Sequence, residues 1–257
     1  MARRWTQLAL GASLARRGPA VIVALLVSAL TAVAAAVLGF VLARRGSTAP
    51  ADAVPILASS ALAWGGGFLH AFSASAGALR RDRTDGIRQL FVARTTSLDG
   101  YLFGRTAGLA LVLAIVVGGG TLLAGLGALV GASGGAGRTL QTTIASVVFA
   151  LLFAVVLAPV SLAALGARTR TAGWAMIVVV LFVPELVTLS MRDVFPAEVT
   201  ELLAIPSALG AVRSALAPDS FDLLRGLRAL LALGAFTAIA TFFLRRDALL
   251  LAHEDLA

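Results

Sequence analysis

The sequence contains no cysteine and no lysine, although it is 257 residues long and carries 21 basic residues, all of them arginines. Without cysteine the chain has no thiol nucleophile, no disulfide and no thiolate ligand for a metal ion. Without lysine it has no P-loop lysine to contact nucleotide phosphates and no amine that could form a Schiff base. Any step that ATP drives therefore requires a second protein that hydrolyses the nucleotide.

Histidine is nearly absent as well, because His70 and His253 are the only two. Two imidazoles do not supply a histidine metal cluster, so we predict no metal site. No set of nucleophile, acid and base gathers at one depth, so an enzyme embedded in the membrane is not favoured. His253 belongs to the C-terminal tail, where a solvated role is expected.

Charge is scarce: charged residues make up 13% of the chain against 59% hydrophobic residues, and the mean hydropathy is +0.95. This balance is far from that of soluble proteins and predicts an all-α integral membrane protein. A helix needs about 20 mostly apolar residues to cross a membrane. The gaps between charges predict six such spans, at residues 19–43, 54–79, 106–131, 140–166, 171–191 and 221–244.

The N-terminal segment precedes an apolar stretch of more than twenty residues. Signal-peptide cores contain only about 7–15 residues, so we expect the first span to be retained. Residues 1–18 predict an interfacial helix on the membrane surface, with Trp5, Leu8 and Ala12 facing lipid.

Arginine is distributed unevenly between the two sides of the predicted topology. The side with both termini holds fourteen of the 21 arginines and six of the 13 acidic residues, so it carries the whole net charge of +8. Cytoplasmic flanks carry the excess of basic residues, which places both termini in the cytoplasm. The same charge lies beside anionic lipid, so we predict contact with membrane lipid and no binding of nucleic acid.

Residues 80–105 form a charged loop between the second and third spans. Ile87, Leu90 and Phe91 recur at helical spacing and predict a short helix over 84–94. Thr84 or Asp82 can cap this helix, and an acid in its first turn is favourable. Thr96 and Asp99 have capping-box spacing for the helix that leads into the third span. The loop therefore offers a short cytoplasmic helix to a partner.

This loop resembles that of the ABC type-2 permease family, the membrane subunits of ATP-driven exporters. The family's loop carries an acid, a glycine and then a short coupling helix. The chain departs from the pattern at Ile87, where the family has threonine, at Thr96, where it has proline, and at Arg105, where it has lysine. The resemblance implies that the docking residues are Asp82, Thr84, Asp85, Gly86, Ile87, Arg88, Leu90, Phe91 and Arg94.

A second resemblance lies at residues 192–220, where Pro196 and Pro206 stand at good first positions of short helices. The family inserts a pair of short outer-face helices there. Membership implies a homodimeric exporter in the bacterial cytoplasmic (inner) membrane, with two ATPase subunits docked on it. It implies no cofactor in this chain, because ATP and Mg²⁺ bind the partner. The segment from Asp82 to Leu90 is also similar to the loop of haem-export permeases.

Two ionisable residues lie at membrane depth and are candidates for a substrate pathway. Glu185 either pairs with Arg192 or another outer arginine, or handles substrate or protons. His70 either hydrogen-bonds a neighbouring helix or has a direct transport role. The alternative function, a gradient-driven secondary transporter, requires coupling acids near the midplane and discontinuous helices.

Overall fold

The structure is a computed structural model that describes residues 2–45, 48–87, 97–131, 136–168, 170–191 and 194–253. Within these ranges every regular element is a helix. Six helical stretches are long and apolar enough to cross a membrane. The prediction of an all-α protein with six candidate spans is therefore confirmed.

The first three spans lie in the N-terminal half, and two of them contain a π-helical segment in mid-course. The elements are α1 (Ala2–Ala15), α2 (Pro19–Arg44), the stretch α3 (Thr48–Ala61), η1 (Leu62–Gly67) and α4 (Phe68–Ser75), the short α5 (Ala78–Thr84), and the stretch α7 (Leu98–Leu113), η2 (Ala114–Gly118) and α8 (Gly119–Gly131).

In the C-terminal half, two short helices lie between the fifth and sixth spans, where a pair was predicted within residues 192–220. The elements are α9 (Ala136–Leu165), the stretch α10 (Arg170–Ile177), η3 (Val178–Phe182) and α11 (Val183–Ser190), then α12 (Ala197–Thr200), α13 (Ile205–Ala215) and α14 (Leu223–His253). Pro206 lies in the first turn of α13, where its missing N–H costs no hydrogen bond.

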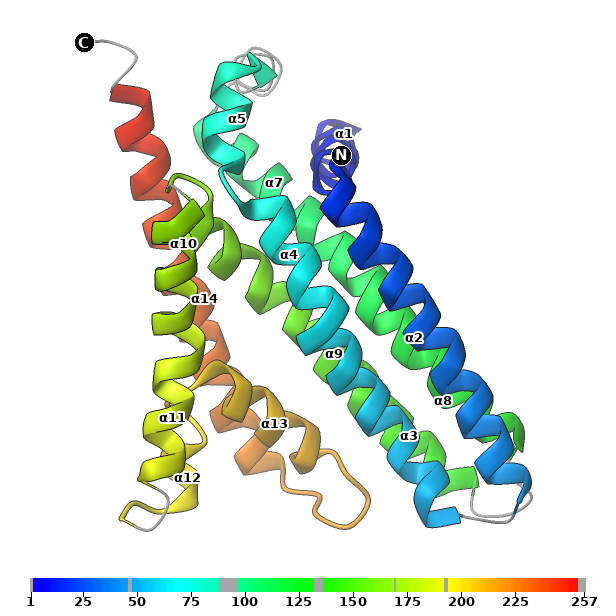
Figure 1. Cartoon of the computed structure of the whole chain (residues 1–257). Coiled ribbons are helices and arrows are strands. Elements are labelled where there is room, and N and C mark those ends of the chain that lie inside the picture. The colour runs from blue at the N-terminus through cyan, green and yellow to red at the C-terminus, as the bar shows by residue number, and fades with distance from the viewer. Residues whose placement is uncertain are drawn as a thin grey trace.

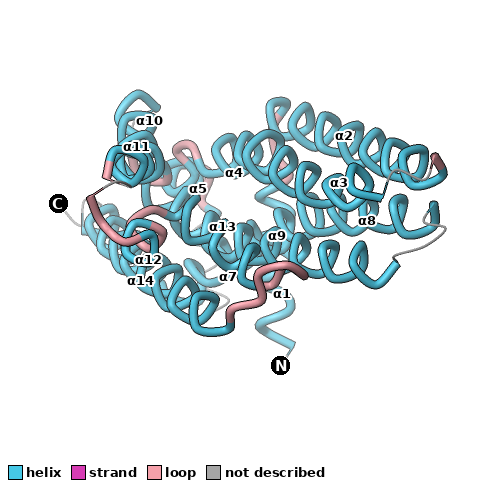
Figure 2. Tube along the Cα trace, turned by 90° about the horizontal axis from the view of Figure 1, so that it is seen from below, coloured by secondary structure: helices cyan, strands magenta, loops and turns pink. Residues whose placement is uncertain are grey.

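Helix α9 is the centre of the molecule. In its most apolar stretch 72% of the residues are buried, against 22% in α2 and in the last two spans. Figures 1 and 2 show α2, α3 and α8 on one side of it and α10, α11 and α14 on the other. The apolar residues exposed on the outer helices then face lipid, where exposure of such side chains is favourable.

Glycine allows two pairs of helices to approach closely. In α8, a Cβ atom added to Gly127 would lie 2.2 Å from the carbonyl oxygen of Ala36 in α2. Between α1 and α7, a Cβ atom added to Gly11 would lie 1.8 Å from the carbonyl oxygen of Gly104. Small residues four positions apart permit such backbone contact between membrane helices. The stretch 104–108 has this spacing, and so does the stretch 11–15.

The prediction that Ala12 faces lipid is wrong. Residues 2–15 form a helix, and Trp5 is 70% exposed, but Ala12 is only 5% exposed. The seam of small residues beginning at Gly11 packs against α7, so contact between backbones decides which face of α1 is buried. The hydrophobic pattern alone did not contain this information.

The glycine clusters 65–67 and 118–120 lie at the π-helical segments of the second and third spans. A Cβ atom on Gly67 would meet Val117, and one on Gly120 would meet Leu62. The two irregular segments thus pack on each other in the interior. This is the close helix packing expected of small residues.

Three span ends differ from the predictions. The second span ends at Ser75, where the chain bends through Gly77 at a φ of 64°. The third begins earlier than residue 106, because Ser97 caps α7 by accepting a hydrogen bond from the Gly100 N–H at 3.1 Å. The sixth continues to His253, well beyond residue 244.

Candidate functional site

The described part of the predicted docking segment, residues 82–87, begins in α5 and lies at the end of the molecule that carries both termini (Figure 1). Helix α5 follows the bend at Gly77 and ends at Thr84, and the chain then turns through Gly86 at a φ of 67°. Glycine adopts such a conformation without the cost that other residues incur. The predicted helix start at Thr84 therefore differs from the structure, because Thr84 closes α5 and Gly86 breaks the helix behind it.

Four predicted docking residues, Arg88, Leu90, Phe91 and Arg94, lie outside the described residues, and so does most of the predicted helix over 84–94. Of the others, Thr84 and Asp85 are exposed, while Gly86 and Ile87 are half-buried. These residues lie at the surface of this end, where a partner can reach them. The hydroxyl of Thr84 donates to the carbonyl oxygen of Arg81 at 3.0 Å.

Asp82 is different from its neighbours because it is buried, with 3% of its surface exposed. Its carboxylate contacts Arg105 of α7 through two oxygens, at 2.7 Å from Nε and 3.0 Å from Nη2. The hydroxyl of Tyr101, one turn earlier in α7, donates to the same carboxylate at 2.7 Å. These three residues are called the Asp82 cluster below. The contact from Nη2 is a charge-assisted hydrogen bond, which is stronger than one between neutral groups.

The start of α5 is attached to the end of α9 through backbone hydrogen bonds. The N–H of Gly77 donates to the Leu165 carbonyl oxygen, and the N–H of Leu79 donates to that of Gly166, both at 3.0 Å. The Nε atom of Arg80 donates to the carbonyl oxygen of Ala167 at 2.7 Å. The open carbonyl groups at the end of α9 are thereby satisfied. Helix α5 is thus bonded to the third and fourth spans at once.

Two further ion pairs connect α14 to this end of the molecule. Arg168, after α9, lies 3.5 Å from the carboxylate of Asp247, and Arg245 lies 3.0 Å from that of Asp99 in α7. The second pair is exposed on both sides, so its contribution to stability is small. Together the pairs connect the last span to α7 and to the end of α9.

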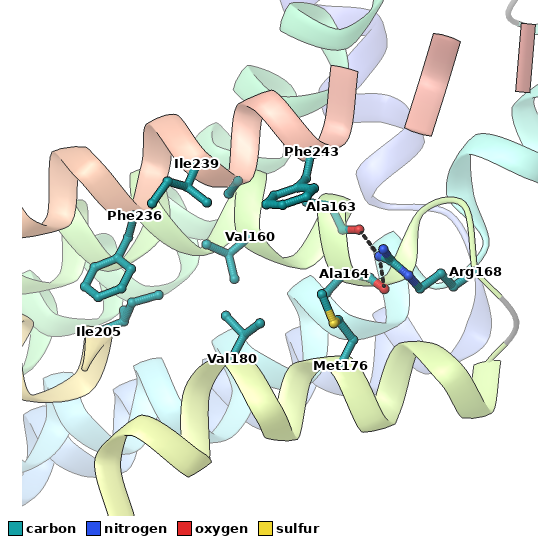
Figure 3. A pocket seen from close by; sticks show the side chains of 11 residues that line it. Val160, Ala163, Ala164, Arg168, Met176, Val180, Ile205, Phe236, Ile239 and Phe243 are labelled. Carbon is teal, nitrogen blue, oxygen red and sulfur yellow. Dashed lines mark hydrogen bonds between the residues drawn. The ribbon is translucent and has the colours of Figure 1, made fainter. Parts of the chain in front are cut away.

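An apolar pocket opens beside this network, between α9, α10, η3, α13 and α14, with a volume of about 120 Å³. Figure 3 shows apolar side chains facing one another across it and Arg168 at one end. Arg168 donates from Nη1 to the carbonyl oxygens of Ala163 at 2.6 Å and Ala164 at 3.2 Å. The other lining residues are Val160, Met176, Val180, Ile205, Phe236, Ile239, Ala240 and Phe243. Such walls suit the hydrocarbon part of a ligand or lipid.

Glu185, the first candidate for a substrate pathway, contacts α13. Its carboxylate accepts a hydrogen bond from the hydroxyl of Ser207 at 2.8 Å. Ser207 belongs to the first turn of α13, where a negative charge is also favoured by the helix dipole. Arg192, the partner considered from the sequence, lies outside the described residues. Glu185 and Ser207 thus join α11 to α13.

His70, the second candidate, is fully buried in α4, and neither of its ring nitrogens has a hydrogen-bond partner among the residues that the structure describes. The hydrogen bond to a neighbouring helix that was considered from the sequence is not found within the described part of the chain. A buried imidazole without partners is costly, and a neutral ring costs less than a charged one. His70 and Glu185 are held by different spans, and no described contact joins them.

Among the described residues, no three His, Asp or Glu side chains gather in a group that could hold a metal ion. Sequence reasoning missed the roles of Tyr101 and Arg105. A predicted third span that began at Leu98 would have contained the charge of Arg105, and that charge would have indicated a buried partner. It also missed Arg213, whose neighbours are far away in sequence.

A comparison with models of known protein families finds no match to this chain, and a comparison with curated protein sequences finds none either.

Proposed function

We propose that this chain is the membrane-spanning subunit of an ATP-driven exporter of the ABC type-2 kind, and that a separate ATPase docks on residues 82–94. Three features support the proposal. The chain has six candidate spans, lacks the lysine of a nucleotide site, and exposes Thr84 and Asp85 at the end that carries both termini.

The Asp82 cluster is the observation that carries the proposal. A docking segment does mechanical work only if its displacement reaches the membrane helices instead of bending a loop. Helix α5 is joined to α7 by a buried two-point ion pair and to the end of α9 by backbone hydrogen bonds. Movement of α5 therefore moves the third and fourth spans with it, as a rigid-body transition requires.

In this proposal two copies of the chain form the pathway, and each receives one ATPase subunit. Nucleotide and Mg²⁺ bind the ATPase, and closure of the two ATPase subunits rotates the two permease copies against each other. The apolar pocket beside α14 supplies a wall suited to an amphiphilic cargo.

The test is co-purification from the native membrane. We expect an ATPase subunit to accompany the wild-type chain and to be lost from the variant Gly86→Pro with Leu90→Asp. Proline cannot adopt the positive φ of Gly86, so the turn that presents the segment changes. The matched control is Leu203→Asp, which places the same charge on an exposed leucine between α12 and α13. This control should retain the ATPase.

A folded wild-type chain that never retains an ATPase would instead favour the gradient-driven transporter. That alternative requires an acid that takes up and releases an ion at membrane depth. Glu185 is the acid that the sequence places at membrane depth, and its carboxylate accepts a hydrogen bond from Ser207. Transport abolished by Glu185→Gln but independent of ATP would support the alternative.

A further inference from the structure

Arg213 of α13 extends its guanidinium into a polar site between α3 and α9. Its Nη1 atom donates to the hydroxyl of Ser60 at 2.8 Å and of Ser59 at 3.2 Å, and to the Ile56 carbonyl oxygen at 3.3 Å. The guanidinium carbon lies 4.6 Å from the centre of the Phe149 ring. The neighbours are thus neutral acceptors and an aromatic face.

The guanidinium lies deep in the molecule. Phe149 is thirteen residues from the start of α9 at Ala136, which is about 20 Å along a helix. It is therefore close to the middle of this 30-residue span. An arginine keeps its proton in proteins. A full positive charge consequently resides near the middle of a membrane span, where charged groups are rare and functional.

No carboxylate balances this charge among the residues that the structure describes. Three arginines near the starts of α9 and α14 each form an ion pair with an acidic residue. Arg138 contacts Asp52 and Asp219, Arg225 contacts Glu201, and Arg228 contacts Glu198. Arg213 stands out because its surroundings supply hydrogen bonds but no counter-charge.

The free donors of Arg213 have the arrangement that an anion requires. All its hydrogen bonds to described residues leave from Nη1, so Nε and Nη2 remain without a partner there. The side chain is partly exposed, so these atoms can be approached. Two parallel N–H groups on one edge of a guanidinium match two oxygens of a phosphate or carboxylate.

We propose that Arg213 is a binding site for the anionic group of an amphiphile, a phosphate or carboxylate carried on a hydrocarbon chain. The depth of the site selects such a ligand, because the apolar part stays among the helices while the anion meets the guanidinium. Ser59 and Ser60 hold the guanidinium in place from the other edge. This inference does not require a partner ATPase, so the two proposals fail separately.

A natural reporter lies beside the site. Trp64 packs edge to face on Phe153, with ring centres 5.2 Å apart. Trp64 lies four residues, about one helical turn, after Ser60, and Phe153 lies four residues after Phe149. The Trp64–Phe153 pair is therefore one turn away from the two side chains that contact Arg213. Replacing Trp5 and Trp174 with phenylalanine leaves Trp64 as the single tryptophan.

The experiment measures quenching of Trp64 by lipids brominated on their acyl chains. The full-length chain in phosphatidylcholine nanodiscs receives either brominated phosphatidylglycerol or brominated phosphatidylcholine. We expect the anionic lipid to quench at an about tenfold lower mole fraction, the size of effect that a charge-assisted two-point contact supports. Arg213→Gln should abolish this preference. Arg45→Gln, which removes an exposed arginine after α2 at the same end, should leave it intact.

Several outcomes overturn the inference. The inference is contradicted if the wild-type chain is quenched equally by the anionic and the zwitterionic lipid. It is also contradicted if a folded Arg213→Gln chain still prefers the anionic lipid. If Arg213→Gln does not fold, Arg213→Lys is used instead, because lysine keeps the charge but lacks the two parallel N–H groups of a guanidinium edge. An unchanged preference for the anionic lipid in Arg213→Lys contradicts the proposal, and a several-fold weaker preference supports it. Added inorganic phosphate identifies the source, since it relieves quenching only if the site also accepts free phosphate.

Discussion

At the scale of single residues, burial separates the charged side chains of the docking segment into two kinds. Asp82 and Asp85 are three positions apart, yet Asp82 is enclosed by Arg105 and Tyr101 while Asp85 is exposed. An acid at a buried position needs a partner because an unpaired charge there is strongly unfavourable. The same sequence motif thus contains a residue that holds the loop and a residue that can meet a partner.

Replacing Asp82 by asparagine should lower the free energy of unfolding by about 3–5 kcal/mol, because Arg105 is left as an unpaired buried charge. The measurement is reversible unfolding in detergent, followed by circular dichroism. Asp85→Asn removes an exposed acid and should change stability by less than about 0.5 kcal/mol. The double variant Asp82→Leu with Arg105→Met should recover much of the loss, since it removes both charges together. Equal losses of stability in Asp82→Asn and Asp85→Asn would contradict the conclusion that Asp82 alone forms a buried ion pair.

His70 offers the opposite prediction. Its ring nitrogens are buried and have no hydrogen-bond partner in the described ranges, so an apolar side chain of similar size removes an unfavourable group and adds none. We expect His70→Leu to be at least as stable as the wild type, and up to about 1 kcal/mol more stable, in the same unfolding measurement. A loss of more than about 2 kcal/mol would show that the imidazole makes a stabilising contact. Loss of transport without loss of stability would identify it as a functional group.

At the scale of elements, small residues decide which helices touch. The contact between α1 and α7 has glycine on both sides, so two backbones meet without intervening side chains. In a membrane the apolar helix surfaces are already surrounded by hydrocarbon, so association depends on such close packing. This is why α1 turns its face of small residues toward α7, while Trp5 stays exposed.

Substituting Gly108 by alanine should detach α1, because the new Cβ atom would lie 2.2 Å from the carbonyl carbon of Gly11. The expected result is faster hydrogen exchange of the amides of residues 2–15 and a loss of about 2 kcal/mol or more. Gly234→Ala is the matched control, since a Cβ atom added there in α14 meets no atom within 4 Å. Alanine is the better helix former, so the control should be neutral or stabilised by up to about 1 kcal/mol. Unchanged exchange in α1 would contradict the contact.

At the scale of the whole molecule, the net charge falls on one side of the predicted topology. Both termini and α5 lie at one end in Figure 1, and the Asp82 cluster, Arg80 and Arg168 connect the helices there. At the opposite end α13 reaches back toward α3 and α9 through Arg213. The two ends therefore have different chemistry, and the asymmetry of arginine predicts which one faces the cytoplasm.

The absence of cysteine makes this orientation directly testable. A cysteine placed at Asp85, exposed beyond α5, should react with a membrane-impermeant maleimide only after the cells are opened. A cysteine at Ser220, exposed before α14, should react in intact cells. The wild-type chain should not be labelled, because it contains no cysteine. The reverse pattern would place both termini outside.

The sequence by itself determined the class of the protein. Six apolar stretches, the scarcity of charge and the missing lysine and cysteine are local properties, because partition between water and lipid depends on the composition of about 20 neighbouring residues. Only the tertiary structure decided the partners of the few polar groups that remain. Asp82 meets Arg105 across 23 positions and Arg213 meets Ser60 across 153, and no local pattern encodes such pairings. They arise because a buried polar group must find its partner on whichever helix the packing of small residues brings beside it.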